Sequence, residues 1–154
     1  MIPSTVERVP QHTNDAINQR IRLQTEENVA RFAAADSQDI EARLAELDRE
    51  WDVERTLEAN AATACLVGLA LGATVSRKWF IFPGVVASFL LQHAVQGWCP
   101  PLPIFRRMGI RTASEIDYER YALKAIRGDF DRLRSQRPGN PAKNAAEAVK
   151  AAAT

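Results

Sequence analysis

The pattern of apolar and polar positions divides the chain into two kinds of segment. Some segments are predicted helices with one polar face, and one long stretch has no polar face at all. A polar helix with a thin apolar stripe is expected over residues 14–35, and a clearer helix over residues 36–58. In the second helix, four apolar residues recur at the spacing of one helix face. They are Ile40, Leu44, Leu47 and Trp51. Asp36 is placed to cap this helix, which meets no breaking residue before the apolar stretch.

The apolar stretch, residues 59–105, carries only two charges, Arg77 and Lys78, which are adjacent. They separate two uncharged segments, residues 59–76 and residues 79–98. As helices these segments would be about 27 Å and about 30 Å long, close to the thickness of a bilayer's hydrocarbon core. The pattern predicts a two-helix transmembrane hairpin with Arg77 and Lys78 at its tip.

The second uncharged segment has interface residues at both of its ends. Trp79 and Trp98 stand where aromatic belts lie in membrane proteins. Pro83 fits best in the first turn of a helix, so we expect the helix to begin near it, and the prolines after Trp98 to end it. The alternative is a soluble hairpin buried on all sides, but the mostly charged flanking helices offer few apolar residues to cover it.

The rest of the chain is expected to lie outside the membrane. Residues 1–13 resemble a flexible arm, and residues 99–134 a juxtamembrane segment followed by a helix. That helix begins with a capping box formed by Thr112 and Glu115. The low-complexity tail, residues 135–154, is predicted to be disordered. The expected fold class is therefore all-α: a two-helix transmembrane hairpin flanked by cytoplasmic amphipathic helices, with a disordered tail.

Charge is distributed unevenly along the chain although the net charge is only +1. The balance is −6 before the apolar stretch and +5 after it, which favours pairing between the acidic helix and the basic one. Nothing in these values points to nucleic acid. Six basic residues flank the two spans, against the two at the tip, which predicts cytoplasmic termini. The six are Arg43, Arg49, Arg55, Arg106, Arg107 and Arg111.

Small residues recur every four positions in the first span and continue in the second. The set that we expect to pack helices closely is Ala64, Gly68, Gly72, Ser76, Gly84 and Ser88. In lipid, small residues let two helix backbones approach, and van der Waals packing then holds the helices together. The sequence leaves two alternatives open: packing of the hairpin on itself, or dimerisation.

Candidate chemistry is sparse. Cys99 is the candidate thiol, with structural, lipid-modified and redox roles all open, and no catalytic partner is evident for it. His93 is expected at the membrane interface, bonded to water or headgroups, with a pigment or haem ligand as the less favoured alternative. Arg106, Arg107 and Arg111 are predicted to contact lipid headgroups. No catalytic residues, metal site or cofactor are predicted.

The stretch of residues 59–130 resembles the YgaP-like transmembrane domain family of bacteria, whose function is largely unknown. The residues that carry the resemblance are "ACLVGLALGATVS", the "GWCP" that ends the second span, and the "RRMGIRTASEIDYERYALKAIRGDF" that follows. The resemblance implies an inner-membrane hairpin with cytoplasmic termini and a tendency to dimerise. The best-known member also carries a rhodanese domain, whose catalytic cysteine loop is missing here, so sulfur transfer is not carried over.

Three functions remain open on the sequence. The first is a membrane scaffold or adaptor without catalytic activity, which self-associates or recruits a partner through its helices. The second is a thiol or sulfur carrier that uses Cys99 at the membrane face. The third is a small accessory subunit of a larger membrane complex, with His93 as a ligand. The partners expected are the lipid bilayer and either a second copy of the chain or a membrane complex.

Overall fold

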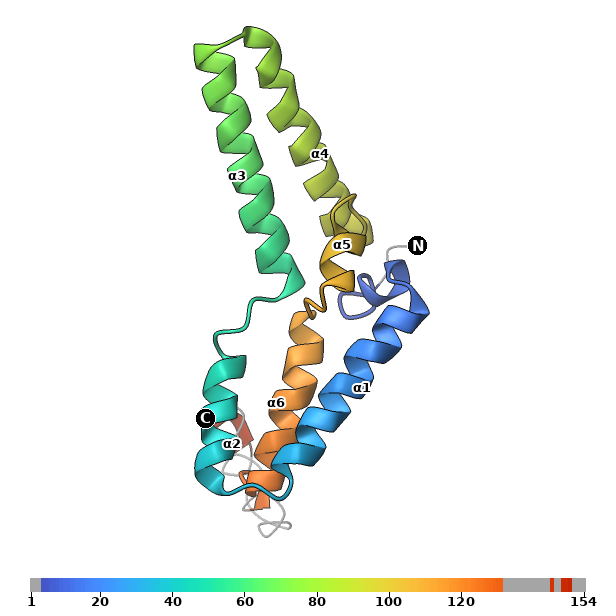
Figure 1. Cartoon of the computed structure of the whole chain (residues 1–154), viewed down its shortest axis with the longest axis vertical. Helices are drawn as coiled ribbons and strands as arrows, with labels where there is room; N and C mark the ends of the chain where they lie inside the picture. Colours follow the sequence, from blue (N-terminus) through green and yellow to red (C-terminus); the bar gives the residue numbers. More distant parts are fainter. Residues whose placement is uncertain (1–3, 132–144, 146–147, 151–154) are drawn as a thin grey trace. The chain divides into compact units, whose positions relative to one another are not determined.

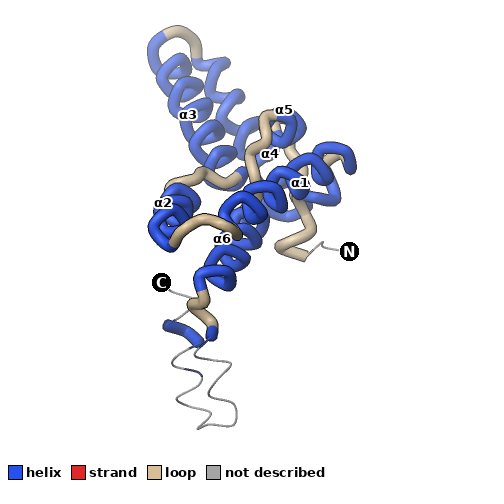
Figure 2. The backbone as a smooth tube through the Cα atoms, turned by 60° about the horizontal axis from the view of Figure 1, so that its bottom comes forward, coloured by secondary structure: helices blue, strands red, loops and turns tan. Residues whose placement is uncertain are grey.

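The computed structural model describes residues 4–131, 145 and 148–150 of the 154-residue chain. In this part of the chain every regular element is a helix and no strand occurs, which confirms the all-α prediction (Figure 2). The elements are η1 (Pro10–His12), α1 (Asp15–Phe32), α2 (Ser37–Leu47), α3 (Val53–Thr74), η2 (Arg77–Phe80), α4 (Ile81–Gln96), α5 (Leu102–Arg107) and α6 (Ala113–Arg127). The predicted disordered tail, residues 135–154, lies outside the described residues except for residues 145 and 148–150.

The chain forms two compact units, each made of two segments. The first unit comprises residues Met1–Gln24 and Glu50–Ile116, and therefore contains the hairpin. The second comprises Thr25–Arg49 and Asp117–Thr154. Each unit has buried apolar residues of its own, and each is described separately below.

The hairpin of α3 and α4 is the longest feature of the first unit (Figure 1). Its first helix does not continue from α2, so the prediction of an unbroken helix through residues 36–58 is wrong. The Asp52 side chain accepts the backbone N–H of Arg55 at 2.7 Å and caps a new helix. The backbone N–H of Val53 donates to the carbonyl of Arg111 at 2.8 Å, which fixes this helix start against a distant segment.

The tip and the second helix follow the sequence closely. Ser76 caps η2, a single 3-10 turn that holds Arg77 and Lys78. α4 begins at Ile81, so Pro83 lies in its first turn, as predicted. The helix ends at Gln96 because Gly97 takes a left-handed conformation, φ 83°, which a residue with a side chain rarely adopts.

An apolar cluster closes the base of the hairpin, the end away from η2. It consists of the buried side chains of Val9, Val53, Leu57, Cys99 and Leu102. Val9 is only 2% exposed, so residues 4–13 are not the flexible arm that the sequence suggests but a packed part of the first unit. We call residues 4–13 the N-terminal strap.

The second unit combines α2 with most of α6. Asp36 caps α2 as predicted, since its carboxylate accepts two backbone N–H groups at 2.9 Å. Ile40, Leu44 and Leu47 bury the apolar face of α2, whereas Trp51 lies beyond the helix and is 49% exposed. Two ion pairs join the helices of this unit, and only the second has its cation on the basic segment and its carboxylate on the acidic one, as the charge distribution suggested. They are Arg43–Glu119 at 2.8 Å and Arg120–Asp48 at 3.1 Å.

Candidate functional site

The hairpin exposes most of its large apolar side chains. α3 and the stretch Arg77–Gln96 are each long and apolar enough to cross a membrane, and only 17% and 6% of them are buried. The core helix of a soluble protein would instead be mostly buried. The exposed large side chains are Leu66, Val67, Leu69, Val75, Trp79, Phe80, Ile81, Phe82, Val85, Phe89, Leu91 and Val95.

The small residues of the hairpin divide between an inner and an outer face. A Cβ on Gly68 would lie 2.8 Å from the Pro83 ring, and a Cβ on Gly72 would lie 2.7 Å from the Phe80 ring. Both glycines therefore serve packing within the hairpin, which occupies the face proposed for dimerisation. Gly84 faces open space, since a Cβ there would meet nothing within 4 Å, and Ser88 is exposed.

Ala64 and Ser76, the remaining members of the predicted set, have different surroundings. Ala64 is half-buried in α3, one turn before Gly68. Ser76 lies at the tip, where its hydroxyl accepts the backbone N–H of Lys78 at 3.4 Å. The six residues predicted from four-residue spacing thus have different roles. Gly68 and Gly72 pack within the hairpin, Ser76 lies in the turn, Gly84 and Ser88 face outward, and Ala64 is half-buried.

The base of the hairpin holds a chain of three ionisable side chains. Glu54, on the first turn of α3, and His93, on the last turn of α4, join the two helices through Glu54 Oε2 and His93 Nε2, 2.9 Å apart. Arg8 of the N-terminal strap donates to Glu54 Oε1 at 2.7 Å and to the carbonyl of Ala94 at 2.8 Å. The strap is thereby tied to both helices of the hairpin.

His93 is 2% exposed, so it is not the solvent-facing interfacial side chain that the sequence suggested. Its Nε2 is engaged by Glu54, so a pigment or haem could bind this nitrogen only by displacing the carboxylate. The second ring nitrogen, Nδ1, is buried without a hydrogen-bond partner. Cys99 is 3% exposed and belongs to the apolar cluster at the same end of the hairpin. The candidate thiol and the histidine therefore lie together at the base of the hairpin.

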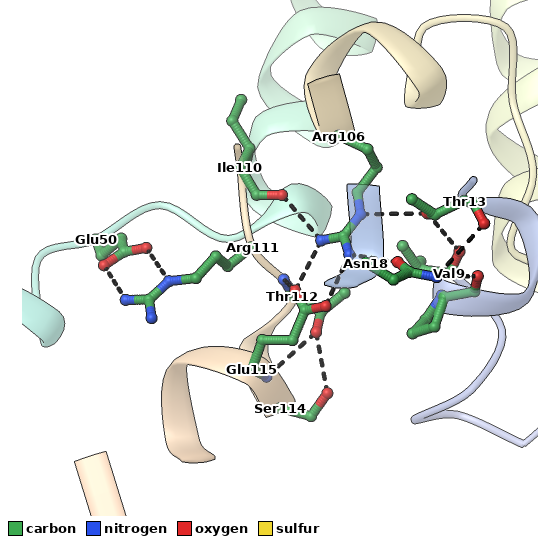
Figure 3. A network of polar contacts seen from close by, with 11 residues as sticks. Val9, Thr13, Asn18, Glu50, Arg106, Ile110, Arg111, Thr112, Ser114 and Glu115 are labelled. Carbon is green, nitrogen blue, oxygen red and sulfur yellow. Dashed lines mark hydrogen bonds and ion pairs between the residues drawn. The ribbon is translucent and has the colours of Figure 1, made fainter. Parts of the chain in front are cut away.

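A second polar network surrounds Arg106, which is completely buried (Figure 3). Its guanidinium donates twice to the Glu115 carboxylate, both times at 2.7 Å. It also donates to the carbonyl of Ile110 at 3.0 Å, to Asn18 at 3.1 Å and to the Thr13 hydroxyl at 3.2 Å. The network connects the N-terminal strap, α1, α5 and the start of α6 within the first unit.

Glu115 also completes the predicted capping box of α6. Its carboxylate accepts the backbone N–H of Thr112 at 2.8 Å, and its own backbone N–H donates to the Thr112 hydroxyl at 3.2 Å. Burial raises the pKa of Glu115, but the hydrogen bonds from Arg106 and Thr112 outweigh that effect, so the net shift of the pKa is downward. The carboxylate is consequently ionised at neutral pH and pairs with a permanently charged guanidinium.

The three arginines predicted to contact headgroups lie in different surroundings. Arg106 is paired with Glu115, and Arg111 donates to both oxygens of Glu50 at 2.7 and 2.6 Å. Both side chains are buried, because their charge is neutralised inside the first unit. Arg107 alone of the three is exposed and can reach a headgroup.

Sequence reasoning missed Glu54 as the partner of His93 and Arg8 as the partner of Glu54, and it did not place His93 and Cys99 at the same end of the hairpin. A usable signal exists for the last pair: a glycine at position 97 reverses the chain between them, which brings residues on either side of the turn together. No comparable signal exists for Arg8 or Glu54, since each resembles an ordinary surface charge. Compared with known proteins, the chain matches no family model, no curated protein and no solved structure, so the similarity to the YgaP-like transmembrane domain family stays a prediction from the sequence.

Proposed function

We propose that this protein is an integral membrane scaffold or adaptor without catalytic activity, anchored by the α3–α4 hairpin. The observation that carries the proposal is the uncovered apolar surface of two helices long enough to span a bilayer. α3 has 22 residues and is therefore about 33 Å long, close to the thickness of the hydrocarbon core. Trp79, 43% exposed at the tip, occupies the position of an interface anchor.

The proposed location is the bacterial inner membrane with both termini in the cytoplasm. The segments that flank the hairpin at its base carry more basic residues than the tip, which has two, Arg77 and Lys78. The rule that basic residues stay in the cytoplasm counts Lys and Arg, and it is little affected by neighbouring carboxylates. The ion pairs of Arg106 and Arg111 therefore do not weaken this assignment.

Partner recruitment is assigned to the helices outside the hairpin. The Gly68–Gly72 face packs against Phe80 of η2 and Pro83 of α4 in the same chain, which favours a partner surface elsewhere. α6 exposes two tyrosines, Tyr118 at 59% and Tyr121 at 45%, and tyrosine is enriched at protein interfaces. The partner is either a second copy or a membrane complex.

Insertion and orientation are tested together. The full chain is expected to resist extraction from membranes by alkaline carbonate. Alkaline phosphatase is expected to be active when fused after Lys78 and inactive when fused at the C-terminus, because it folds only outside the cytoplasm. Release of the protein by carbonate would refute insertion, whereas the reverse phosphatase pattern would refute only the orientation.

Recruitment is tested by photo-crosslinking in native membranes. A photoreactive phenylalanine analogue at Tyr118 is expected to give a discrete adduct. The same analogue at Leu23, an exposed residue of α1, serves as the control. Identical adduct patterns at the two positions would contradict recruitment through α6.

A further inference from the structure

The short helix α5, which follows the second span, has an apolar residue on each of two sides. Its inner side is filled, because Leu102 belongs to the apolar cluster at the base of the hairpin and Arg106 is held by the buried network. Its outer side is open, since Ile104 is 58% exposed and Met108, one turn later, is 71% exposed. The packing of α5 within the first unit therefore leaves this outer pair uncovered.

The contacts around α5 hold the outer pair outward. On the side before the helix, the N-terminal strap lies directly on Gly97, where a Cβ would be 2.3 Å from the carbonyl oxygen of Arg8. On the side after it, the backbone N–H of Ile110 donates to the carbonyl of Phe105 at 3.1 Å. Both ends of the segment are fixed, so whatever covers the outer pair comes from outside the first unit.

A second exposed pair lies at the start of α3. The guanidinium of Arg55 lies over the Trp51 ring, 4.4 Å from its centroid, and both side chains are exposed. Val53, between them in the sequence, packs in the same apolar cluster as Leu102 of α5. The Trp51–Arg55 pair and α5 are therefore at the same level along the hairpin, at its base.

That level is about one bilayer thickness away from the tip. The 22 residues of α3 extend over about 33 Å, and Trp79 is exposed at the tip. With the tip at one membrane interface, Trp51 and α5 lie at the other. Tryptophan is typical of that depth, and arginine reaches it with its charged end in water.

The apolar surface of the hairpin continues to this level. Val95, on the last turn of α4, is exposed, and the outer pair of α5 follows within the next turns of the chain. A lipid leaflet that surrounds the hairpin would therefore also meet α5, and no partner of another kind is needed to cover it.

The charge of α5 and its flanks selects the class of lipid. Residues 97–114 contain three arginines and no Asp or Glu. Two of the three are neutralised by ion pairs within the first unit, so Arg107 is the exposed charge. A basic side chain near the membrane surface attracts anionic lipid. Arg55 is followed by Glu58, which is also exposed, so the selectivity is assigned to Arg107.

We propose that Trp51, Arg55, Ile104, Arg107 and Met108 form a collar that binds the anionic phospholipid leaflet at the base of the hairpin. The apolar members and the Trp51 ring enter the boundary between acyl chains and headgroups, and Arg107 contacts lipid phosphate. The proposal rests on the membrane insertion proposed above, and it adds the class of lipid and the residues that bind it.

Depth is tested with the full chain in phosphatidylcholine vesicles whose acyl chains carry bromine near the headgroups, since bromine quenches tryptophan only on close approach. Four proteins with a single tryptophan are compared, with Phe at the other tryptophan positions. They retain Trp79, retain Trp51, or carry Met108→Trp or Leu23→Trp. The first three are expected to lose fluorescence about twofold or more, as side chains at an interface, and Leu23→Trp on α1 to be unquenched.

Each failure has a different meaning. An unquenched Trp79 would refute insertion, and the collar with it. A quenched Trp79 with an unquenched Trp51 or Met108→Trp would overturn the collar alone. A Met108→Trp emission that is blue-shifted but unquenched would show that protein, such as a second copy, covers the patch, and would overturn it too. Quenching of Leu23→Trp equal to that of Met108→Trp would also contradict the collar.

The class of lipid is tested with Met108→Trp in mixed vesicles, in which either phosphatidylglycerol or phosphatidylcholine carries the bromine. A preference of about fivefold for the anionic lipid is expected, as for one basic residue near the surface. Arg107→Gln is expected to remove this preference and Arg107→Lys to keep it. Equal quenching by the two lipids, or a preference that Arg107→Gln leaves unchanged, would overturn the assignment of anionic lipid.

Discussion

Arg106 has an acceptor for each of its five guanidinium N–H groups, supplied by Thr13, Asn18, Ile110 and, twice, Glu115. Lysine has three donors on a single point and could not reproduce this arrangement. The neighbouring residue, Arg107, is exposed and uses its backbone carbonyl, not its side chain, to hold Arg20 at 2.7 Å. Two adjacent arginines therefore have opposite roles, one buried and structural and the other at the surface.

This contrast gives the first prediction. Arg106→Met leaves the Glu115 carboxylate without its partner, and we expect the free energy of unfolding to fall by about 3–5 kcal/mol. Arg107→Met serves as the matched control and should change it by no more than about 0.5 kcal/mol. Urea unfolding in mild detergent, followed by circular dichroism, measures both. Equal effects of the two substitutions would contradict the assignment.

The second prediction concerns pH. The pKa of Glu115 is lowered in the folded protein from its usual value of 4.5, so the carboxylate contributes stability above that value. The contribution is lost as pH falls through the lowered pKa. We expect Glu115→Gln to unfold at a lower temperature than the parent protein at neutral pH, and the difference to shrink below pH 4.5. A difference that is constant across this range would show that the charge of Glu115 does not stabilise the fold.

For single residues, the sequence predicted the interactions between residues that lie close together in the chain. The capping box of Thr112 and Glu115 and the cap at Asp36 depend on residues two or three positions apart, and both are present. The pairing of Arg106 with Asn18 spans 88 positions, and no local pattern encodes it. The headgroup role expected for Arg106 was therefore reasonable from the sequence, although the structure gives it another.

At the scale of elements, the hairpin shows why equal spacing does not mean equal environment. Gly68 faces the Pro83 ring, which is fixed to the backbone of α4, whereas Gly84 faces open space. The four-residue spacing identified both glycines as packing positions. Which of them packs depends on the rotation of each helix about its axis, and that is set by its partner.

The third prediction follows from this difference. Gly68→Ala places a Cβ 2.8 Å from the Pro83 ring and forces the two helices apart, so we expect a loss of about 1–3 kcal/mol. Gly84→Ala should be neutral or stabilising by up to about 1 kcal/mol, since alanine favours helix and meets no atom there. Thermal unfolding in detergent compares the two variants. A larger loss for Gly84→Ala would mean that the hairpin packs through its other face.

The break between α2 and α3 belongs to the same scale. Periodicity suggested one continuous helix, because no glycine or proline interrupts residues 36–58. Asp52 ends that continuity by capping α3, and the bond from Val53 to the Arg111 carbonyl holds the new helix start. Helix breaks made by an internal cap and a distant acceptor are difficult to detect in a sequence, since aspartate also occurs on helix surfaces.

At the scale of the whole molecule, the exposed apolar side chains of the hairpin lead to different expectations in water and in a bilayer. Leu66 on α3 is 67% exposed and Leu23 on α1 is 55% exposed, so in water the two positions would tolerate a charge equally well. In a bilayer they differ, because only Leu66 would face lipid.

The fourth prediction is that Leu66→Lys impairs membrane integration and Leu23→Lys does not. A lysine near the centre of a span costs about 2.5–3.5 kcal/mol on insertion scales. The fraction of each variant that resists carbonate extraction measures the difference. Equal resistance to carbonate of the two variants would indicate that Leu66 does not lie in lipid.

The composition of the chain already predicted the hairpin, because two uncharged segments separated by two basic residues allow few other folds. The N-terminal strap was not predictable in the same way. Its polar and proline-containing sequence resembles a loose terminus, and its contacts with Glu54 and Ala94 lie 46 and 86 positions away. Order in this segment comes from partners that the segment itself does not reveal.

The position of the strap on Gly97 also sets an order of events during biosynthesis. Arg8 leaves the ribosome long before Glu54 and Gly97, yet it bonds to the first of them and lies against the second. The base of the hairpin cannot close until both long helices have been synthesised, so Arg8, which is made before them, is among the last residues to reach its final place. A chaperone that holds the N-terminal strap during translation would therefore delay closure without affecting the hairpin.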